Sequence, residues 1–386
     1  MVYISDYAGF IDNKARETHV IFSSANMPRG KLSGTRVFIR TDVNYIFLNC
    51  IENSWFLNGV IGFGKDLLET IDKLKLLIKE LGDHYVVFYG GSMGGYGALL
   101  YGLHIRPHRV VATGVEYILG IKGGFFNKHC LNKNLICTDS SNEYLYNLVN
   151  CNKEYLDKVF LIYGERAFSD LICALKMSSD GFSNIFTIVN EDHSIPPFLT
   201  SFFDISDLIS SKDIYSSLGA FSGNIVNYPD FVNACYEFYV NKNAYSLLDF
   251  KDIENLPPLV RSYYYFYRFL YEKKKGVIKA SFWLERAIYL NRSCPIILYN
   301  YADYMNLIGD YNTALMYSKL SYSFYVKGVK PLYNAQLSCI ESLINLENHD
   351  EAIKSFALFK EKISKSALNN PHIALRITKI ESRLGI

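Results

Sequence analysis

A strand-like run that ends in glycines most strongly constrains how this chain can fold. Residues 85–97 read Y-V-V-F-Y-G-G-S-M-G-G-Y-G, and a helical pattern continues to about residue 104. The stretch G-G-S-M-G fits G-x-S-x-G, which between a strand and a helix forms a nucleophile elbow, a sharp turn that exposes the serine above a sheet. Glycines two positions before and after are needed because side chains there would strike neighbouring elements. The pattern predicts Ser92 as a nucleophile.

A phosphate-binding loop is the alternative for the same glycines. The stretch lacks the Lys-Ser/Thr of a P-loop and the G-x-G-x-x-G order of a dinucleotide fold. The strand–turn–helix context therefore favours the elbow.

The surrounding sequence alternates short apolar runs with helical patterns up to about residue 210. The strand-like runs are 19–22, 45–48, 85–89, 109–113, 159–163 and 185–189. A helical pattern over 65–81 ends at Gly82, as helices commonly do. This alternation predicts an α/β fold with a mostly parallel sheet of about six strands and helices on both faces.

The strand patterns disappear beyond about residue 215, and helical patterns replace them. Ala280, Ala314 and Ala352 open similar segments that lie 34 and 38 residues apart. This spacing resembles the tetratricopeptide repeat, in which small residues allow two helices to cross closely; an unrelated helical bundle is the alternative. Since 386 residues exceed one comfortable core, we expect an α/β domain over 1–212 and a helical domain over 213–386.

A serine elbow needs a histidine base, and the histidine comes last in the chain order serine, acid, histidine. The run 185–189 leads directly into N-E-D-H-S-I-P-P, so His193 lies in a short loop after the last predicted strand. This position makes His193 the candidate base.

The acid should follow the preceding strand, where the sequence reads Y-G-E-R-A-F-S-D-L. Related folds often carry an aspartate about three residues past the glycine, but Ala167 stands there. Asp170 is the preferred acid because the longer loop gives its carboxylate room to turn toward the histidine. Glu165 is the alternative acid, and Arg166 could pair with either carboxylate.

Two backbone amides would complete an oxyanion hole. One belongs to Met93, the residue after the nucleophile, and the other to the loop 23–26 after an early strand. Ala25 is the first choice in this loop, Ser24 the second, and an ordinary turn remains an alternative. The insertion 117–150 is either a lid or a surface excursion.

Composition excludes several classes of function. The 40 basic and 38 acidic residues leave a formal charge of +2, so we expect no nucleic acid partner. The eight cysteines show no C-x-x-C pair, and we expect no metal site. No apolar run is long enough for a membrane span, and the first residues have no secretory pattern, so we expect a cytoplasmic protein.

Residues 15–210 together resemble the α/β-hydrolase superfamily. The segments N53-S-W-F-L-N-G and G-G-S-M-G-G-Y-G-A are similar to bacterial esterases of surface-carbohydrate loci. The resemblance implies a serine esterase without metal or organic cofactor that removes or moves O-acetyl groups on sugars, with Ser92, His193 and Asp170 as its triad. An acyltransferase with the same triad is one alternative. The other is a scaffold that binds a protein partner through its helical repeats and carries a vestigial hydrolase domain.

Overall fold

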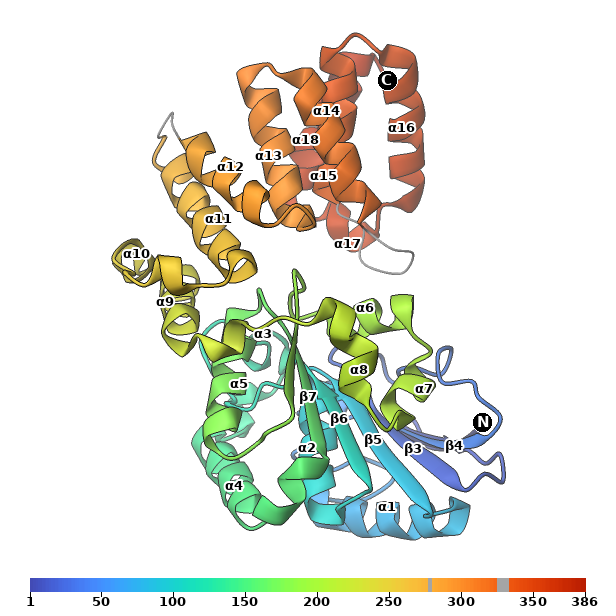
Figure 1. Ribbon diagram of the computed structural model, residues 1–386. Coiled ribbons are helices and arrows are strands. Elements are labelled where there is room, and N and C mark those ends of the chain that lie inside the picture. Colours follow the sequence, from blue (N-terminus) through green and yellow to red (C-terminus); the bar gives the residue numbers. More distant parts are fainter. Residues whose placement is uncertain (277–279, 325–332) are drawn as a thin grey trace. The chain divides into compact units, whose positions relative to one another are not determined.

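The computed structural model describes residues 1–276, 280–324 and 333–386 (Figure 1). The chain divides into two compact units, Met1–Ser246 and Leu247–Ile386. This division lies later in the chain than the expected boundary at 212/213. The reason is that the intervening segment packs on unit 1: helix α9 (Pro229–Tyr239) contacts helix α5 (Phe168–Ser179).

Unit 1 is built on an eight-stranded sheet in the order β1-β2-β4-β3-β5-β6-β7-β8. Its strands are β1 (Val2–Ser5), β2 (Ala8–Ile11), β3 (Glu17–Phe22), β4 (Val43–Leu48), β5 (Tyr85–Gly91), β6 (Arg109–Thr113), β7 (Val159–Gly164) and β8 (Ile185–Ile188). The six predicted strands are all present and mutually parallel, so the predicted α/β class is confirmed.

The predicted number of about six strands is too low. The two additional strands, β1 and β2, form an antiparallel hairpin that joins the sheet edge through β4. Each has only four residues, and the side chains of β1 are largely exposed, so neither shows the buried apolar run by which the other strands are recognised.

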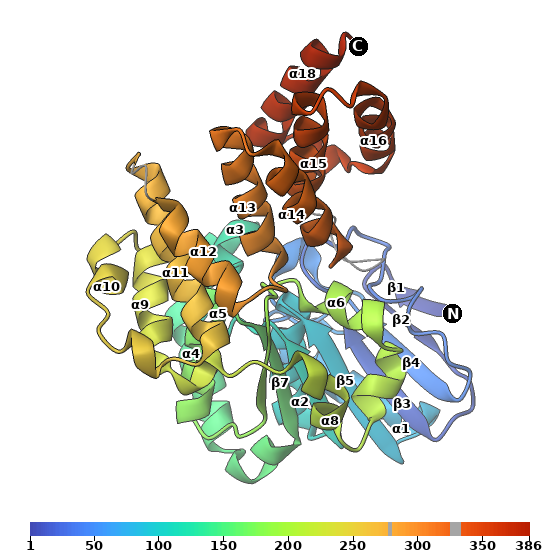
Figure 2. The same cartoon turned by 45° about the horizontal axis from the view of Figure 1, so that its top comes forward.

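Helices cover both faces of the sheet (Figures 1 and 2). Those of unit 1 are α1 (Leu67–Leu81), α2 (Met93–Ile105), α3 (Phe126–His129), α4 (Thr138–Asn150), α5, α6 (Ile195–Phe202), α7 (Ile205–Ser210), α8 (Ile214–Leu218) and α9, followed by α10 (Ala244–Leu248) at the division. One apolar cluster joins Val87 and Val111 of the sheet to Phe198 of α6 and Leu208 of α7. On the other face, α2 packs against β3, β5 and β6.

Unit 2 consists of helices in the part of it that the structure describes. They are α11 (Pro258–Lys274), α12 (Ser281–Leu290), α13 (Pro295–Ile308), α14 (Tyr311–Ser323), α15 (Tyr333–Asn345), α16 (His349–Lys362), α17 (Lys365–Leu368) and α18 (Pro371–Leu384). Ala280, Ala314 and Ala352 are buried at the starts of α12, α14 and α16. The tetratricopeptide assignment stays a prediction, and residues 277–279 of its first segment lie outside the described residues. None of the described helices is both long and apolar enough to cross a membrane.

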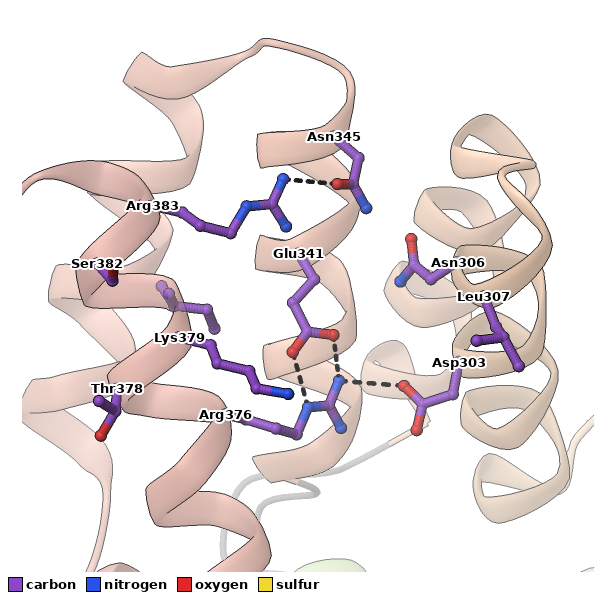
Figure 3. A pocket seen from close by; sticks show the side chains of 11 residues that line it. Asp303, Asn306, Leu307, Glu341, Asn345, Arg376, Thr378, Lys379, Ser382 and Arg383 are labelled. Carbon is purple, nitrogen blue, oxygen red and sulfur yellow. Dashed lines mark hydrogen bonds and ion pairs between the residues drawn. The ribbon is translucent and has the colours of Figure 1, made fainter.

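A cavity of about 750 Å³ lies between α13, α15 and α18 of unit 2 (Figure 3). Arg376 points from α18 to the carboxylate of Glu341 on α15, with bonds of 2.9 and 2.7 Å, and to Asp303 on α13 at 3.1 Å. The guanidinium also contacts Ser338, and its side chain is 18% exposed. Because both carboxylates are bonded to Arg376, we infer that this cluster stabilises the packing of α13, α15 and α18 against one another.

Arg376→Met is expected to destabilise unit 2 by about 3 kcal/mol, because it leaves two partly buried carboxylates without their cation. Calorimetry of the full chain should show the unit 2 transition at a lower temperature. Arg383→Met is the matched control, since exposed Arg383 donates one bond to Asn345 at the same cavity. Equal transition temperatures for the two variants would contradict this stabilising role of Arg376.

Candidate active site

The turn between β5 and α2 has the geometry of a nucleophile elbow. Ser92 adopts φ 56° and ψ −121°, a region that side chains rarely occupy. Its N–H donates to the carbonyl of Thr113 at 2.8 Å, which fixes the turn to β6. A Cβ at Gly94 would lie 2.2 Å from the Phe22 carbonyl oxygen, and one at Gly90 would lie 2.1 Å from the Gly94 carbonyl oxygen. Glycine is therefore required at both positions.

The structure brings the predicted nucleophile, base and acid into one hydrogen-bonded chain. His193 Nε2 lies 2.8 Å from Ser92 Oγ, and His193 Nδ1 lies 2.6 Å from Asp170 Oδ2. Asp170 is buried in the first turn of α5, and His193 follows β8. Such a chain can remove a proton from the serine and orient the imidazole that receives it.

The alternative acid, Glu165, is also buried but has other partners. Its Oε1 accepts the N–H groups of Asn224 and Ile225 at 2.8 and 3.0 Å, and Thr187 Oγ lies 3.3 Å away. These contacts tie β7 to the segment that follows α8. The geometry therefore favours Asp170 over Glu165 as the partner of His193.

The loop 23–26 lies beside the elbow, because Ser24 Oγ donates to the Gly91 carbonyl at 3.0 Å. Two of its N–H groups are already used: that of Ser23 donates to Leu48, and that of Asn26 donates to the side chain of Asn53. The N–H groups of Ala25 and Ser24 remain as candidates for one oxyanion donor. Met93 begins α2, so its N–H has no acceptor within the helix.

Asn53 supports this loop, a role that no pattern in the sequence predicts. Its Oδ1 accepts from Asn26 N–H at 2.8 Å, and its Nδ2 donates to the carbonyl of His129 at 2.8 Å. Asn53, Trp55 and Phe56 all have positive φ, a strained backbone that often accompanies functional sites. In the sequence, the segment N53-S-W-F-L-N-G indicates only a family likeness, which carries no such geometry.

An aromatic ring covers the histidine, which the sequence does not predict either. The Phe125 ring stacks on the His193 imidazole with centroids 3.6 Å apart and an interplanar angle of 10°. Phe125 belongs to the insertion 117–150, whose later helix α4 packs on α2. The first part of the insertion therefore contributes to the site. The sequence Gly-Gly-Phe-Phe alone does not predict that Phe125 will stack on His193.

The charges around His193 favour its protonated form. Burial alone would lower the pKa of His193, but the charge and hydrogen bond of Asp170 outweigh burial, and Glu116 and Asp192 add to the increase. The pKa is raised above its ordinary value of 6.5. Since a base must be neutral, activity should fall as the pH drops through this raised pKa.

No group of three or more His, Cys, Asp or Glu side chains that could hold a metal ion is present among the described residues. The chemistry that the described side chains support at Ser92 is nucleophilic attack assisted by a base.

Comparison with known proteins gives only distant likenesses. No family model matches the chain, and no curated protein matches it either. Its fold is similar to that of a capsule O-acetyltransferase of Neisseria meningitidis serogroup A in complex with CoA, at 15% identity over 47% of this chain and 82% of the other, with a TM-score of 0.37.

Two further solved structures are similar at the same level. One is the Glycosylation Associate Protein (Gap123) complex of Streptococcus agalactiae, at 14% identity over 50% of this chain and 42% of the other, with a TM-score of 0.38. The other is the fluorophosphonate-binding serine hydrolase FphF of Staphylococcus aureus, at 15% identity over 46% and 75% of the two chains, with a TM-score of 0.34. At such TM-scores these likenesses carry no argument about activity.

Proposed function

We propose that unit 1 is a serine hydrolase that cleaves an acyl ester. The observation that supports this most is the hydrogen-bonded chain from Ser92 through His193 to Asp170, with the serine held on a strained elbow. A strained serine with a base and a buried acid in line behind it does not stabilise the fold in any evident way. Nucleophilic catalysis explains this arrangement.

The reaction follows from the positions of these groups. As Ser92 Oγ attacks the ester carbonyl carbon, its proton passes to His193 Nε2, and Asp170 stabilises the resulting imidazolium. The amides of Met93 and Ala25 hold the oxyanion. The carbon–oxygen bond to the alcohol then breaks, the alcohol leaves with the proton from His193, and an acyl-serine remains. Water deprotonated by His193 attacks this ester and releases the acid.

We further propose that the acyl group is an acetyl ester on a carbohydrate or glycoconjugate. This rests on the sequence resemblance to esterases of surface-carbohydrate loci. An acyltransferase would use the same three residues, with an acceptor hydroxyl in place of water. Incubation with an O-acetylated oligosaccharide separates the two by NMR, since a hydrolase releases acetate and a transferase acetylates an added sugar.

A fluorophosphonate probe tests the nucleophile directly. Wild-type protein should be labelled once, on the peptide that contains Ser92, because the activated hydroxyl attacks phosphorus as it would attack a carbonyl. Labelling should be lost in Ser92→Ala and strongly slowed in His193→Gln, as followed by intact-mass spectrometry. Equal labelling of wild type and Ser92→Ala, or none in either, would refute a serine hydrolase. The remaining alternative would be a scaffold protein whose hydrolase domain is vestigial.

A further inference from the structure

A buried carboxylate lies directly behind the aromatic cover of His193. Glu116 follows β6 and is 2% exposed. Its Oε2 accepts the N–H groups of Phe125 and Phe126, both at 2.7 Å. Its Oε1 is buried without a hydrogen-bond partner among the described residues. A Cβ at Gly124 would lie 2.2 Å from Oε1, so the carboxylate packs tightly under the turn 124–126.

These two hydrogen bonds hold the backbone that carries the Phe125 ring. A carboxylate that accepts two backbone N–H groups makes charge-assisted bonds, which are stronger than neutral ones. The ring in turn lies flat on His193, whose Nε2 faces Ser92 Oγ. A stacked ring limits rotation of the imidazole, and its π-face attracts the imidazolium that forms when the serine loses its proton.

Glu116 also acts on His193 through its charge. Burial and, to a smaller extent, the charge of Asp170 raise the pKa of Glu116 to about 7, against the lowering effect of its two amide bonds and of His193. The Glu116 charge raises the pKa of His193 in return. The other titratable groups facing this pair are Asp170 and Cys173 on α5, Asp192 beside the histidine, and His129 on α3.

We propose that Glu116 is a positioning residue for the reaction at Ser92: through its two hydrogen bonds to the backbone of residues 125 and 126 it holds the Phe125 ring on His193. This inference rests on the function proposed for unit 1. It deepens that function by assigning a task to a buried acid that the triad does not use.

Kinetics of four variants test the connection from Glu116 through Phe125. Glu116→Ala and Phe125→Ala should each lower kcat by about tenfold with little change in KM, since both remove the stacked ring. The double variant should be no slower than the slower single variant, because residues that act through one contact are not additive. Glu116→Gln keeps an oxygen for the two amides and removes the charge. In this variant kcat should fall less than in Glu116→Ala, because an acceptor for the two backbone N–H groups remains.

A measurement without turnover separates this inference from the proposed function. In a Ser92→Ala background, NMR should show the His193 ring proton Hε1 displaced by the ring current of Phe125. Adding Glu116→Ala or Phe125→Ala should abolish the displacement, and adding Glu116→Gln should preserve it. Glu191→Gln is the matched control: burial also raises the pKa of Glu191 to about 7, but no backbone N–H of residues 124–126 is bonded to its carboxylate in the described structure.

The possible results distinguish the positioning contact from the hydrolase function. Additive kinetic effects, or a ring-current displacement that survives Glu116→Ala, would overturn the proposal. If Glu116→Ala does not fold, loss of the ring-current displacement in Glu116→Gln, which keeps an acceptor oxygen, would overturn it instead. Loss of the displacement in a protein that shows no serine-dependent activity would support the positioning contact and refute only the hydrolase function.

Discussion

Ser92→Ala is expected to lower kcat/KM for p-nitrophenyl acetate by about 10⁴- to 10⁶-fold, as removal of a serine nucleophile does in serine proteases. The expected loss is large because the acyl-serine intermediate cannot form without the hydroxyl of Ser92. Alanine at 92 retains the Cβ and the burial of its neighbours. The fold should therefore persist, which circular dichroism and a thermal melt can verify.

A second serine variant provides the control for this measurement. Ser169 lies in α5 beside Asp170, and its hydroxyl donates to the carbonyl of Lys122 at 3.3 Å. Ser169→Ala should hydrolyse the ester at close to the wild-type rate. If Ser92→Ala also keeps the wild-type rate, the hydrolysis does not occur at the elbow and the enzyme proposal is wrong.

Asp170→Asn is expected to reduce kcat by about 10⁴-fold, the effect of the same change in a serine protease triad. An asparagine retains the shape of the side chain, but it cannot stabilise the imidazolium and can orient the wrong tautomer of His193. The short Nδ1–Oδ2 contact of 2.6 Å is the interaction that this variant changes.

Glu165→Gln is the matched variant, because it removes one negative charge from the other buried carboxylate that follows β7. Glutamine keeps an oxygen for the N–H groups of Asn224 and Ile225, so we expect kcat close to wild type and a loss of stability of about 1 kcal/mol. The reverse result, with activity lost only in Glu165→Gln, would show that Glu165 is the acid.

Several features could be predicted because they depend on neighbouring residues. The elbow needs only a strand, close-packed glycines and a serine, all within residues 85–97. The six parallel strands carry buried apolar runs, and His193 could be placed because chain order follows from the connectivity of the sheet. Local sequence therefore identified the nucleophile and its base as candidates.

The choice of acid could not be made in the same way. Both Glu165 and Asp170 follow β7, and loop length does not determine which carboxylate turns toward the histidine. In the folded chain, Asn224 and Ile225 approach Glu165 from a segment about sixty residues later. Once their amides hold Glu165, Asp170 is left to face His193.

The sequence alone determined the α/β class, the elbow and the candidate pair Ser92 and His193, since these follow from local patterns and strand order. Only the tertiary structure decided that Asp170 is the residue that meets the imidazole, and that Glu116 and Phe125 lie behind it and on it. These contacts join residues far apart in the chain. Each depends on where a turn directs one side chain, and no spacing in the sequence encodes that direction.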